Sequence, residues 1–143
     1  MLTMSYPMTI RHETDGHYHV YVRDLPEVIT SGKTLAKARA MAADAVAVAV
    51  HGRMEDEMDL PAPSRPRRGE VVVGLPAQLA AKAIVFRAWR ASGITKVEFA
   101  RLLGVQEAEA RRILNPRHGT KLERLEEAAS ALGVRLLVAS DAA

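Results

Sequence analysis

The 143-residue sequence contains no cysteine, which excludes disulfide bonds, thiolate metal ligands and cysteine nucleophiles. It also lacks long hydrophobic runs, and the longest of them, residues 45–50, is far too short to span a bilayer. The first ten residues do not combine a basic start with an apolar core, so no secretory signal is visible. We therefore expect a cytoplasmic protein with no membrane partner.

Recognisable catalytic patterns are missing as well. The sequence has no glycine-rich phosphate-binding loop and no Ser/His/Asp arrangement in a familiar context. Asp15, Asp24 and Glu27 are carboxylates of the kind that bind a catalytic metal, but turns and bends use such residues for local hydrogen bonds. We expect no catalytic residue, no cofactor and no enzymatic activity. A metal-dependent nuclease that uses Asp24 and Glu27 is kept as an alternative.

Histidines raise the question of a metal site. His17 and His19 share one face of a predicted strand, and His12 is placed across the hairpin from them. Such a group can hold a metal, but no fourth ligand has a suitable spacing. We expect these side chains to face solvent or a partner, and predict no metal site.

Charge is distributed unevenly along the chain. Residues 1–60 contain 6 Lys/Arg and 9 Asp/Glu, residues 61–143 contain 14 and 8, and the whole chain carries +3. A basic half is the electrostatic feature expected of a nucleic-acid-binding module joined to a part with another role. We predict two domains, residues 1–74 and 75–143, with a Pro/Arg-rich connector at 61–69 inside the first.

The first domain is predicted to begin with three antiparallel strands. Residues 6–12 and 17–23 alternate around an Asp-Gly turn signal, as in a hairpin that buries one face. Residues 28–30 are β-branched and indicate a third short strand, which Gly32 ends.

A helix and a fourth strand are predicted to complete this domain. Thr34 is a suitable N-cap, and the helix is expected to end at Gly52. Residues 70–73 predict a strand that returns to the sheet edge, so the order is β-β-β-α-β. The helix is expected to lay a stripe of small side chains on the sheet, formed by Leu35, Ala38, Ala42, Ala45 and Ala49.

The second domain is predicted to be helical, with a final short strand. Pro76 begins a helix that runs to about residue 92 and places Trp89 in the core. The last helix covers about residues 121–132, with Leu122 among its inward-facing residues. Residues 134–138 are almost wholly apolar and predict a strand that pairs with a second copy of the chain or with another strand of the same chain.

Residues 96–115, KVEFARLLGVQEAEARRILN, form the most informative stretch. They indicate two short helices and a tight turn, with small Ala100 at the helix crossing and Gly104 where a positive φ is needed. This pattern is typical of a helix-turn-helix, whose second helix can enter the major groove of DNA. An ordinary helical hairpin is the alternative. The core positions are predicted to be Val97, Phe99, Ala100, Leu102, Leu103, Ala110, Ile113 and Leu114.

The remaining face of the second helix is the predicted DNA-reading surface. Arginine suits guanine, Gln106 suits adenine, Ala108 suits the thymine methyl group and Glu107 can accept from cytosine. Basic residues beside the motif are better placed for phosphates. The predicted DNA-binding residues are Lys96, Gln106, Glu107, Ala108, Arg111, Arg112, Asn115, Arg117 and Lys121.

Short motifs follow one another along the first domain: Tyr6-Pro7, Asp15-Gly16, Tyr18, Asp24-Leu25-Pro26, Thr30-x-Gly32, Thr34-Leu35 and Leu60-Pro61-x-Pro63-Ser64. In this order the chain resembles the HicB-type antitoxins of bacterial type II toxin–antitoxin systems. The resemblance covers essentially the whole chain, because one branch of that family carries a helix-turn-helix in its second domain. It departs from the family after Pro26, where Glu27-Val28 stand in place of a frequent Gly-Cys.

The resemblance implies a first domain that is a trimmed relative of the ribonuclease H fold and that blocks the active site of a HicA toxin, a small RNA-cleaving protein. We hypothesise an antitoxin that neutralises this toxin and represses its own operon by binding operator DNA as a dimer or tetramer, becoming nucleoid-associated. The candidate toxin-binding residues are His17, His19, Tyr21 and Arg23. A stand-alone transcriptional regulator with a ligand-sensing first domain is the main alternative.

Overall fold

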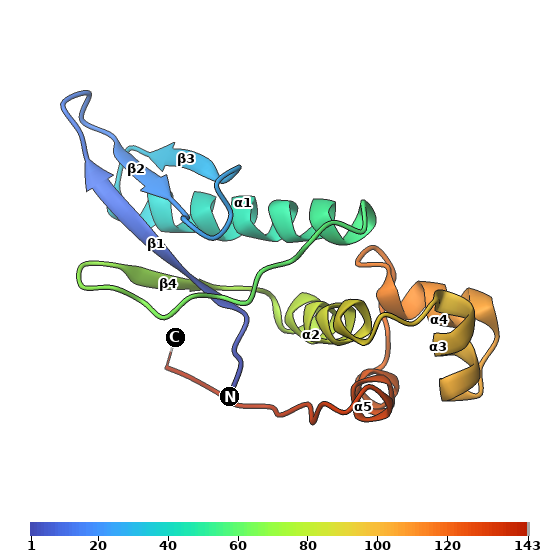
Figure 1. The fold of residues 1–143 in the computed structure, drawn as a ribbon. Helices are drawn as coiled ribbons and strands as arrows, with labels where there is room; N and C mark the ends of the chain where they lie inside the picture. The colour runs from blue at the N-terminus through green and yellow to red at the C-terminus, as the bar shows by residue number, and fades with distance from the viewer. Residues whose placement is uncertain (143) are drawn as a thin grey trace. The chain divides into compact units, whose positions relative to one another are not determined.

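A computed structural model describes residues 1–142 (Figure 1). The chain is α+β and divides into two compact units, Met1–Ala80 and Ala81–Ala143. The boundary falls inside helix α2 (Ala77–Ser92), and the predicted boundary after residue 74 lies just before this helix. No helix of residues 1–142 is both long enough and apolar enough to cross a membrane.

The first unit is a four-stranded antiparallel sheet with one long helix. Its strands are β1 (Ser5–His12), β2 (Tyr18–Tyr21), β3 (Ile29–Gly32) and β4 (Val71–Gly74), in the spatial order β3-β2-β1-β4. Helix α1 (Leu35–Glu55) contacts β2, β3 and β4 and lies along the sheet (Figure 1). The predicted order β-β-β-α-β is confirmed, including the return of the last strand to the sheet edge.

Strand register separates a buried face of the sheet from an exposed one. Ile10 pairs with Val20 and Tyr6 with Val73, so these residues point to the same side. Alternate residues point to the other side, where Tyr21 pairs with Thr9 on β1 and with Ile29 on β3. The strand residues that belong to the core of this unit lie on the buried face: Tyr6, Met8, Val20 and Val73.

Helix α1 begins as predicted but ends later. The Thr34 hydroxyl accepts the Lys37 backbone N–H (3.1 Å), so the predicted N-cap is confirmed. The predicted end at Gly52 is wrong, because the helix continues for a further turn that buries Met54. The predicted stripe is right only at Ala38 and Ala42: Leu35 is exposed, and Ala45 and Ala49 are half-buried. The buried residues repeat every four positions: Ala38, Ala42, Val46, Val50 and Met54.

The junction between β3 and α1 requires glycine. A Cβ added to Gly32 would lie 2.4 Å from the backbone nitrogen of Ala38. Any side chain here would therefore push the first turn of α1 away from the sheet.

The second unit is helical. It contains most of α2, followed by α3 (Lys96–Leu103), α4 (Glu107–Leu114) and α5 (Leu122–Ala131). Trp89 is buried, as predicted. The predicted burial of Val97, Leu102 and Leu122 is wrong, because these short helices bury only one face and these residues lie off it. The core is formed by Ala81, Ala83, Val85, Phe86, Trp89, Phe99, Ala100, Ala110, Ile113, Leu114, Leu125, Ala128 and Ala129.

The predicted final strand is absent from the described chain. Residues 134–138 have no regular secondary structure, and none of the four strands pairs with them. Gly133 (φ 81°) ends α5, and the Val134 N–H donates to the Ala129 carbonyl (2.9 Å), which closes the helix. Pairing with another strand of the same chain was therefore a wrong prediction, because a strand needs a hydrogen-bonded neighbour.

Candidate functional site

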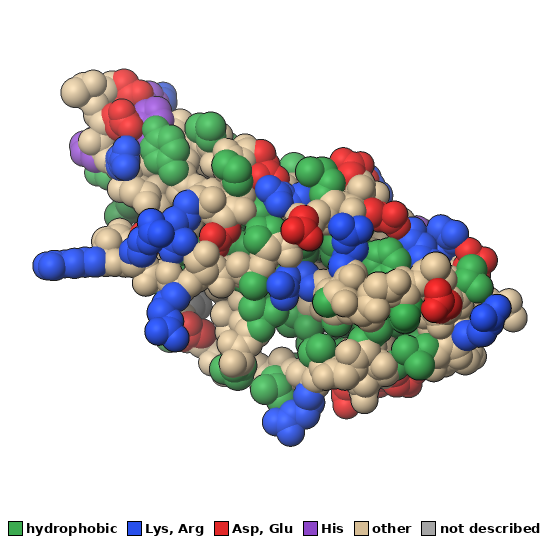
Figure 2. All heavy atoms as spheres, in the orientation of Figure 1, with side chains coloured by type: hydrophobic (Ala, Val, Ile, Leu, Met, Phe, Trp, Pro, Cys, Tyr) green, Lys and Arg blue, Asp and Glu red, His purple; other side chains and the backbone are tan. Residues whose placement is uncertain are grey.

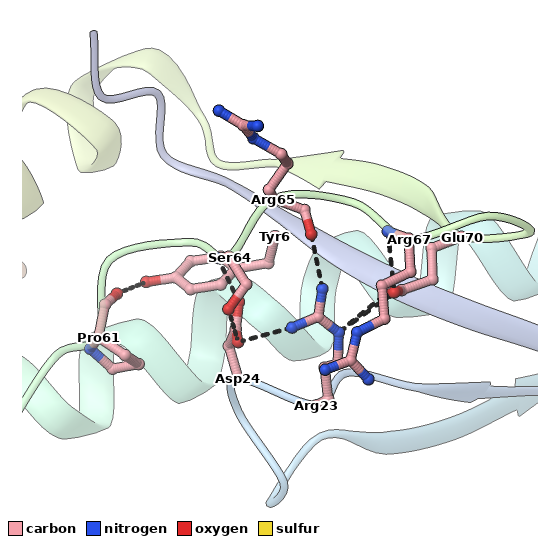
Figure 3. Close-up of polar contacts among 8 residues, drawn as sticks. All are labelled: Tyr6, Arg23, Asp24, Pro61, Ser64, Arg65, Arg67 and Glu70. Atoms are coloured by element: carbon pink, nitrogen blue, oxygen red, sulfur yellow. Dashed lines mark hydrogen bonds and ion pairs between the residues drawn. The ribbon is translucent and has the colours of Figure 1, made fainter.

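The connector, residues 61–69, is hydrogen-bonded to β1 and to the turn after β2 (Figure 3). The Asp24 carboxylate accepts the Ser64 backbone N–H (2.7 Å) and the Ser64 hydroxyl (2.6 Å). The Tyr6 hydroxyl donates to the Pro61 carbonyl (2.9 Å). Sequence motifs 40 or more positions apart therefore meet in space, which gives a physical reason for their occurrence together.

Arg23 holds the same segment from the other side. Its Nε lies 3.1 and 3.2 Å from the two carboxylate oxygens of Glu70, and its Nη2 donates to the Arg65 carbonyl (2.8 Å; Figure 3). Nη1 lies 3.7 Å from Asp24. The guanidinium predicted to bind toxin is thus occupied by internal contacts that fix the connector.

The other candidate toxin-binding residues lie near the tip of the β1–β2 hairpin. Asp15 accepts the His17 backbone N–H (2.8 Å), and its second oxygen lies 2.8 Å from His19 Nε2. These hydrogen bonds, the His17 one first, lower the pKa of Asp15 below its ordinary value. The two imidazole rings are neighbours, with centroids 6.4 Å apart. Figure 2 shows histidine and acidic side chains together at this tip.

Tyr21 extends this group along the exposed face of β2. The Arg11 guanidinium lies 5.5 Å from the centre of its ring, and its hydroxyl donates to Glu13 (3.3 Å). Its cross-strand neighbour Ile29 is 69% exposed. The structure therefore brings His19, Tyr21 and Ile29 to one open surface, which we call the β2 face.

The carboxylates considered for a nuclease have other partners. Both oxygens of Glu27 accept from Arg53, at 2.7 and 2.9 Å, and this interaction lowers the pKa of Glu27. Asp24 is bound to Ser64. Within residues 1–142, no group of three or more His, Asp or Glu side chains is arranged to hold a metal ion. This geometry does not support the nuclease alternative.

The second candidate site is the pair α3 and α4. Thr95 and Glu98 form a reciprocal capping box at the start of α3, and Gly104 ends it in the left-handed conformation (φ 67°). The Val105 N–H then donates to the Ala100 carbonyl (3.0 Å). The predicted positive φ at Gly104 is confirmed. Only two further residues precede α4, so the turn is tight.

The outer face of α4 carries exposed basic groups. The Arg111 Nη2 and Nε lie 2.7 and 3.1 Å from Glu107 Oε1, one turn earlier. Arg112 Nη1 is 3.8 Å from Glu109, which also lies 3.8 Å from Arg124 of α5. Exposed pairs of this kind stabilise a helix by only about 0.2–0.5 kcal/mol, so a stronger anion can displace the carboxylate.

The remaining predicted DNA-binding residues lie around α4. Gln106 is exposed at the N-cap of α4, Ala108 is exposed in its first turn, and Lys121 is exposed just before α5. The Asn115 side-chain oxygen accepts the Arg117 N–H (2.9 Å), so this amide shapes the turn after α4. Lys96 is separate from this group, at the start of α3, with its Nζ 6.0 Å from the centre of the Trp89 ring.

Lys82 is a functional candidate that the sequence analysis missed. It is 0% exposed, and it is the one buried charged residue in the described part of the chain. Its Nζ donates to the carbonyls of Arg112 (2.9 Å) and His118 (2.5 Å) and to the Thr120 hydroxyl (2.7 Å). Burial lowers the pKa of Lys82 to about 8, partly offset by the Glu109 carboxylate. Its helical spacing from Leu79 and Phe86 was an available signal, since it places a lysine on an apolar face.

The observed units also change the distribution of charge. Residues 1–80 contain 9 Lys/Arg and 10 Asp/Glu, and residues 81–143 contain 11 and 7. The contrast is smaller than the sequence division suggested, because Arg65, Arg67 and Arg68 fold with the first unit. The second unit still carries the basic excess.

Comparison with known proteins identifies relatives of the whole chain. A family model described as the HicB-like antitoxin of a bacterial toxin–antitoxin system matches residues 5–84. Antitoxin HicB 2 of Photorhabdus laumondii is 37% identical over 133 residues, covering 93% of this chain and 94% of that protein. Antitoxin HicB of Escherichia coli strain K12 is 35% identical, covering 93% and 96%. Antitoxin HicB of Pseudomonas fluorescens is 33% identical, covering 92% and 91%.

Proposed function

Because the chain belongs to the HicB-like antitoxin family, we propose that it neutralises a cognate HicA-type RNA-cleaving toxin and represses its own operon by binding operator DNA. The observation that carries the proposal is the family match over residues 5–84, which coincides with the first unit, together with similarity over nearly the whole chain. The protein then acts as a non-catalytic regulator in the cytoplasm, as a dimer or tetramer, and is nucleoid-associated when bound to DNA.

We assign toxin binding to the β2 face of the first unit. An exposed aromatic and an exposed aliphatic side chain, Tyr21 and Ile29, lie side by side on adjacent strands, with His19 next to them. Apolar side chains surrounded by polar ones are the usual composition of a protein interface. The first unit as a whole is close to neutral, with 9 Lys/Arg and 10 Asp/Glu, so we assign its affinity for the toxin to the contacts of the β2 face and not to net charge. Three consecutive antiparallel strands followed by a helix agree with a trimmed ribonuclease H-like fold.

We assign DNA binding to the pair α3 and α4 as a helix-turn-helix. The tight turn at Gly104, the close crossing at buried Ala100 and the exposed arginines of α4 support this assignment. In this arrangement α4 enters the major groove, with Arg111 and Arg112 reaching base edges. Residues of the loop after α4 then contact phosphates.

Co-expression with the short open reading frame adjacent to the gene tests the proposal. We expect a stable complex and rescue of growth from the toxicity of that small protein. Ile29→Asp places a charge in the β2 face and should weaken the complex at least about tenfold, because a buried unpaired charge is costly. Val48→Asp is the matched control, since Val48 is 71% exposed on α1 and lies away from that face. Equal loss of rescue with both variants, or no complex with the unmodified chain, contradicts the assignment.

A further inference from the structure

Lys82 connects α4 to the loop that follows it. The Arg112 carbonyl belongs to the last turn of α4, where it accepts only the Asn115 backbone N–H (3.2 Å) from the chain that ends the helix. The His118 carbonyl and the Thr120 hydroxyl belong to the loop of residues 115–121, which we call the α4 loop. One ammonium group donates to all three oxygens, at 2.5 to 2.9 Å.

The chemistry of this position suits lysine in particular. A protonated amine has three hydrogens and no acceptor, and it faces three acceptor oxygens and no carboxylate within hydrogen-bond distance. The side chain is fully buried, so water does not compete for these bonds. Removal of the ammonium takes one hydrogen-bond donor from each of these three groups, and the α4 loop loses the three hydrogen bonds that join it and the end of α4 to Lys82 of α2.

The residues tied together in this way carry the basic groups assigned to DNA. Arg111 and Arg112 lie on the outer face of α4, and Arg117 and Lys121 lie in the α4 loop, all four exposed. Base readout and phosphate contact depend on one another, because phosphate contacts fix the register in which side chains meet base edges. A shift of α4 relative to its loop would therefore weaken the contacts with base edges. It would not change the positive charge that attracts DNA of any sequence.

We propose that Lys82 is a positioning residue for sequence-specific DNA recognition, which holds α4 and the α4 loop in a fixed relative geometry without touching DNA. This inference rests on the proposed DNA-binding function of α3 and α4. It predicts that the Lys82 contacts determine discrimination between DNA sequences more than they determine attraction to DNA in general.

The test compares binding of the full-length protein to two DNA duplexes. One is the region immediately upstream of the gene, and the other is a scrambled duplex of equal length and composition. Lys82→Met keeps the length and apolar stem of the side chain and removes the ammonium. Phe86→Leu is the control for lost stability, because Phe86 is buried one turn further along α2 and makes none of the three hydrogen bonds. Binding is measured below the melting temperature of every variant.

Lys82→Met is expected to lose roughly ten- to a hundred-fold in affinity for the upstream duplex, the value of one good base contact. Its affinity for the scrambled duplex should stay within about twofold, because that binding depends on phosphate neutralisation. Phe86→Leu should lower the melting temperature and keep the preference for the upstream duplex. A preserved preference in Lys82→Met, or an equal loss in Phe86→Leu, overturns the inference.

Thr120→Val is the second variant, which tests the inference if Lys82→Met does not fold. It keeps the lysine and removes one of its three acceptors. We expect a smaller loss of preference for the upstream duplex, of about three- to tenfold, equivalent to one buried hydrogen bond. An unchanged preference overturns the inference. Absence of any preference in the unmodified protein overturns the DNA-binding proposal itself, and the role of Lys82 with it.

Discussion

Single residues in this protein carry charge in two very different settings. Arg53 and Glu27 form a bidentate pair at the surface, where Glu27 is 43% exposed, and solvent weakens its contribution to stability. Lys82 is out of contact with solvent. Both the stabilisation from its hydrogen bonds and the free-energy cost of its desolvation are therefore large. Substitution at Lys82 should therefore affect the protein far more than substitution at Arg53.

The contacts of Glu27 and Val28 account for the departure from the family pattern after Pro26. The resemblance indicates a frequent Gly-Cys after Pro26, and this chain has Glu27-Val28. The backbone at Glu27 does not have a positive φ, so glycine is not required there. The Glu27 side chain binds Arg53, and Val28 is buried, so both substituted residues have defined contacts.

The pKa of Lys82 predicts a specific dependence of stability on pH. The pKa is about 8 in the folded protein, against an ordinary value of 10.5 that we expect when the chain is unfolded. Below about pH 8 both states hold the proton. Between pH 8 and 10.5 only the unfolded state holds it, so the free energy of unfolding rises with pH by up to about 3 kcal/mol from this group.

Urea unfolding of the unmodified protein and of Lys82→Met at pH 7, 8.5 and 10 measures this contribution. The fluorescence of Trp89, the one tryptophan of the sequence, reports on the second unit. The stability of the unmodified protein minus that of Lys82→Met should increase with pH. A constant or falling difference would show that the lysine is not desolvated as described.

At the scale of elements, the connector behaves as part of the first unit. Its composition, rich in proline and arginine and almost free of large apolar residues, predicts only an irregular segment. Asp24, Arg23 and Tyr6 hold it by side-chain hydrogen bonds (Figure 3). It thereby guides the chain back to β4 at the sheet edge.

Asp24→Asn is expected to release this segment. The change removes the negative charge that accepts two hydrogen bonds from Ser64, and should cost about 1–3 kcal/mol, as for other charged hydrogen-bond partners. Trypsin should then cleave after Arg67 and Arg68 several-fold faster. Asp44→Asn on the exposed side of α1 is the control and should leave the cleavage rate unchanged. Equal rates for both variants would mean that Asp24 does not anchor the connector.

At the scale of the whole molecule, the two units are proposed to have separate functions. Replacement of both Arg111 and Arg112 by alanine should abolish the preference for operator DNA, since two base contacts contribute roughly 2–6 kcal/mol of discrimination. Neutralisation of the toxin should be retained, because the β2 face belongs to the other unit.

A reporter fused to the upstream region and a growth-rescue assay measure the two functions in the same cells. Arg90→Ala/Arg135→Ala is the matched control, since it also removes two exposed positive charges from the second unit. The control should retain repression. Loss of growth rescue together with repression in Arg111→Ala/Arg112→Ala would refute the division of labour.

The order of the elements could be read from the sequence because local signals specify it. Thr34 and Thr95 start helices, Gly104 ends one, and alternation of apolar residues marks the first two strands. Such signals act over a few residues, so the sequence is sufficient to reveal them. The family resemblance rested on motifs of the same kind.

Contacts between distant positions could not be read in this way. The pairing of Asp24 with Ser64, and of Lys82 with the loop 36 to 38 residues later, depends on which surfaces of packed elements face one another. The same packing buried Met54 and extended α1 beyond Gly52, and it left residues 134–138 without a strand to join. The sequence by itself determined where elements begin and what they are. The tertiary structure decided which charged groups are free to bind a partner and which are already bound.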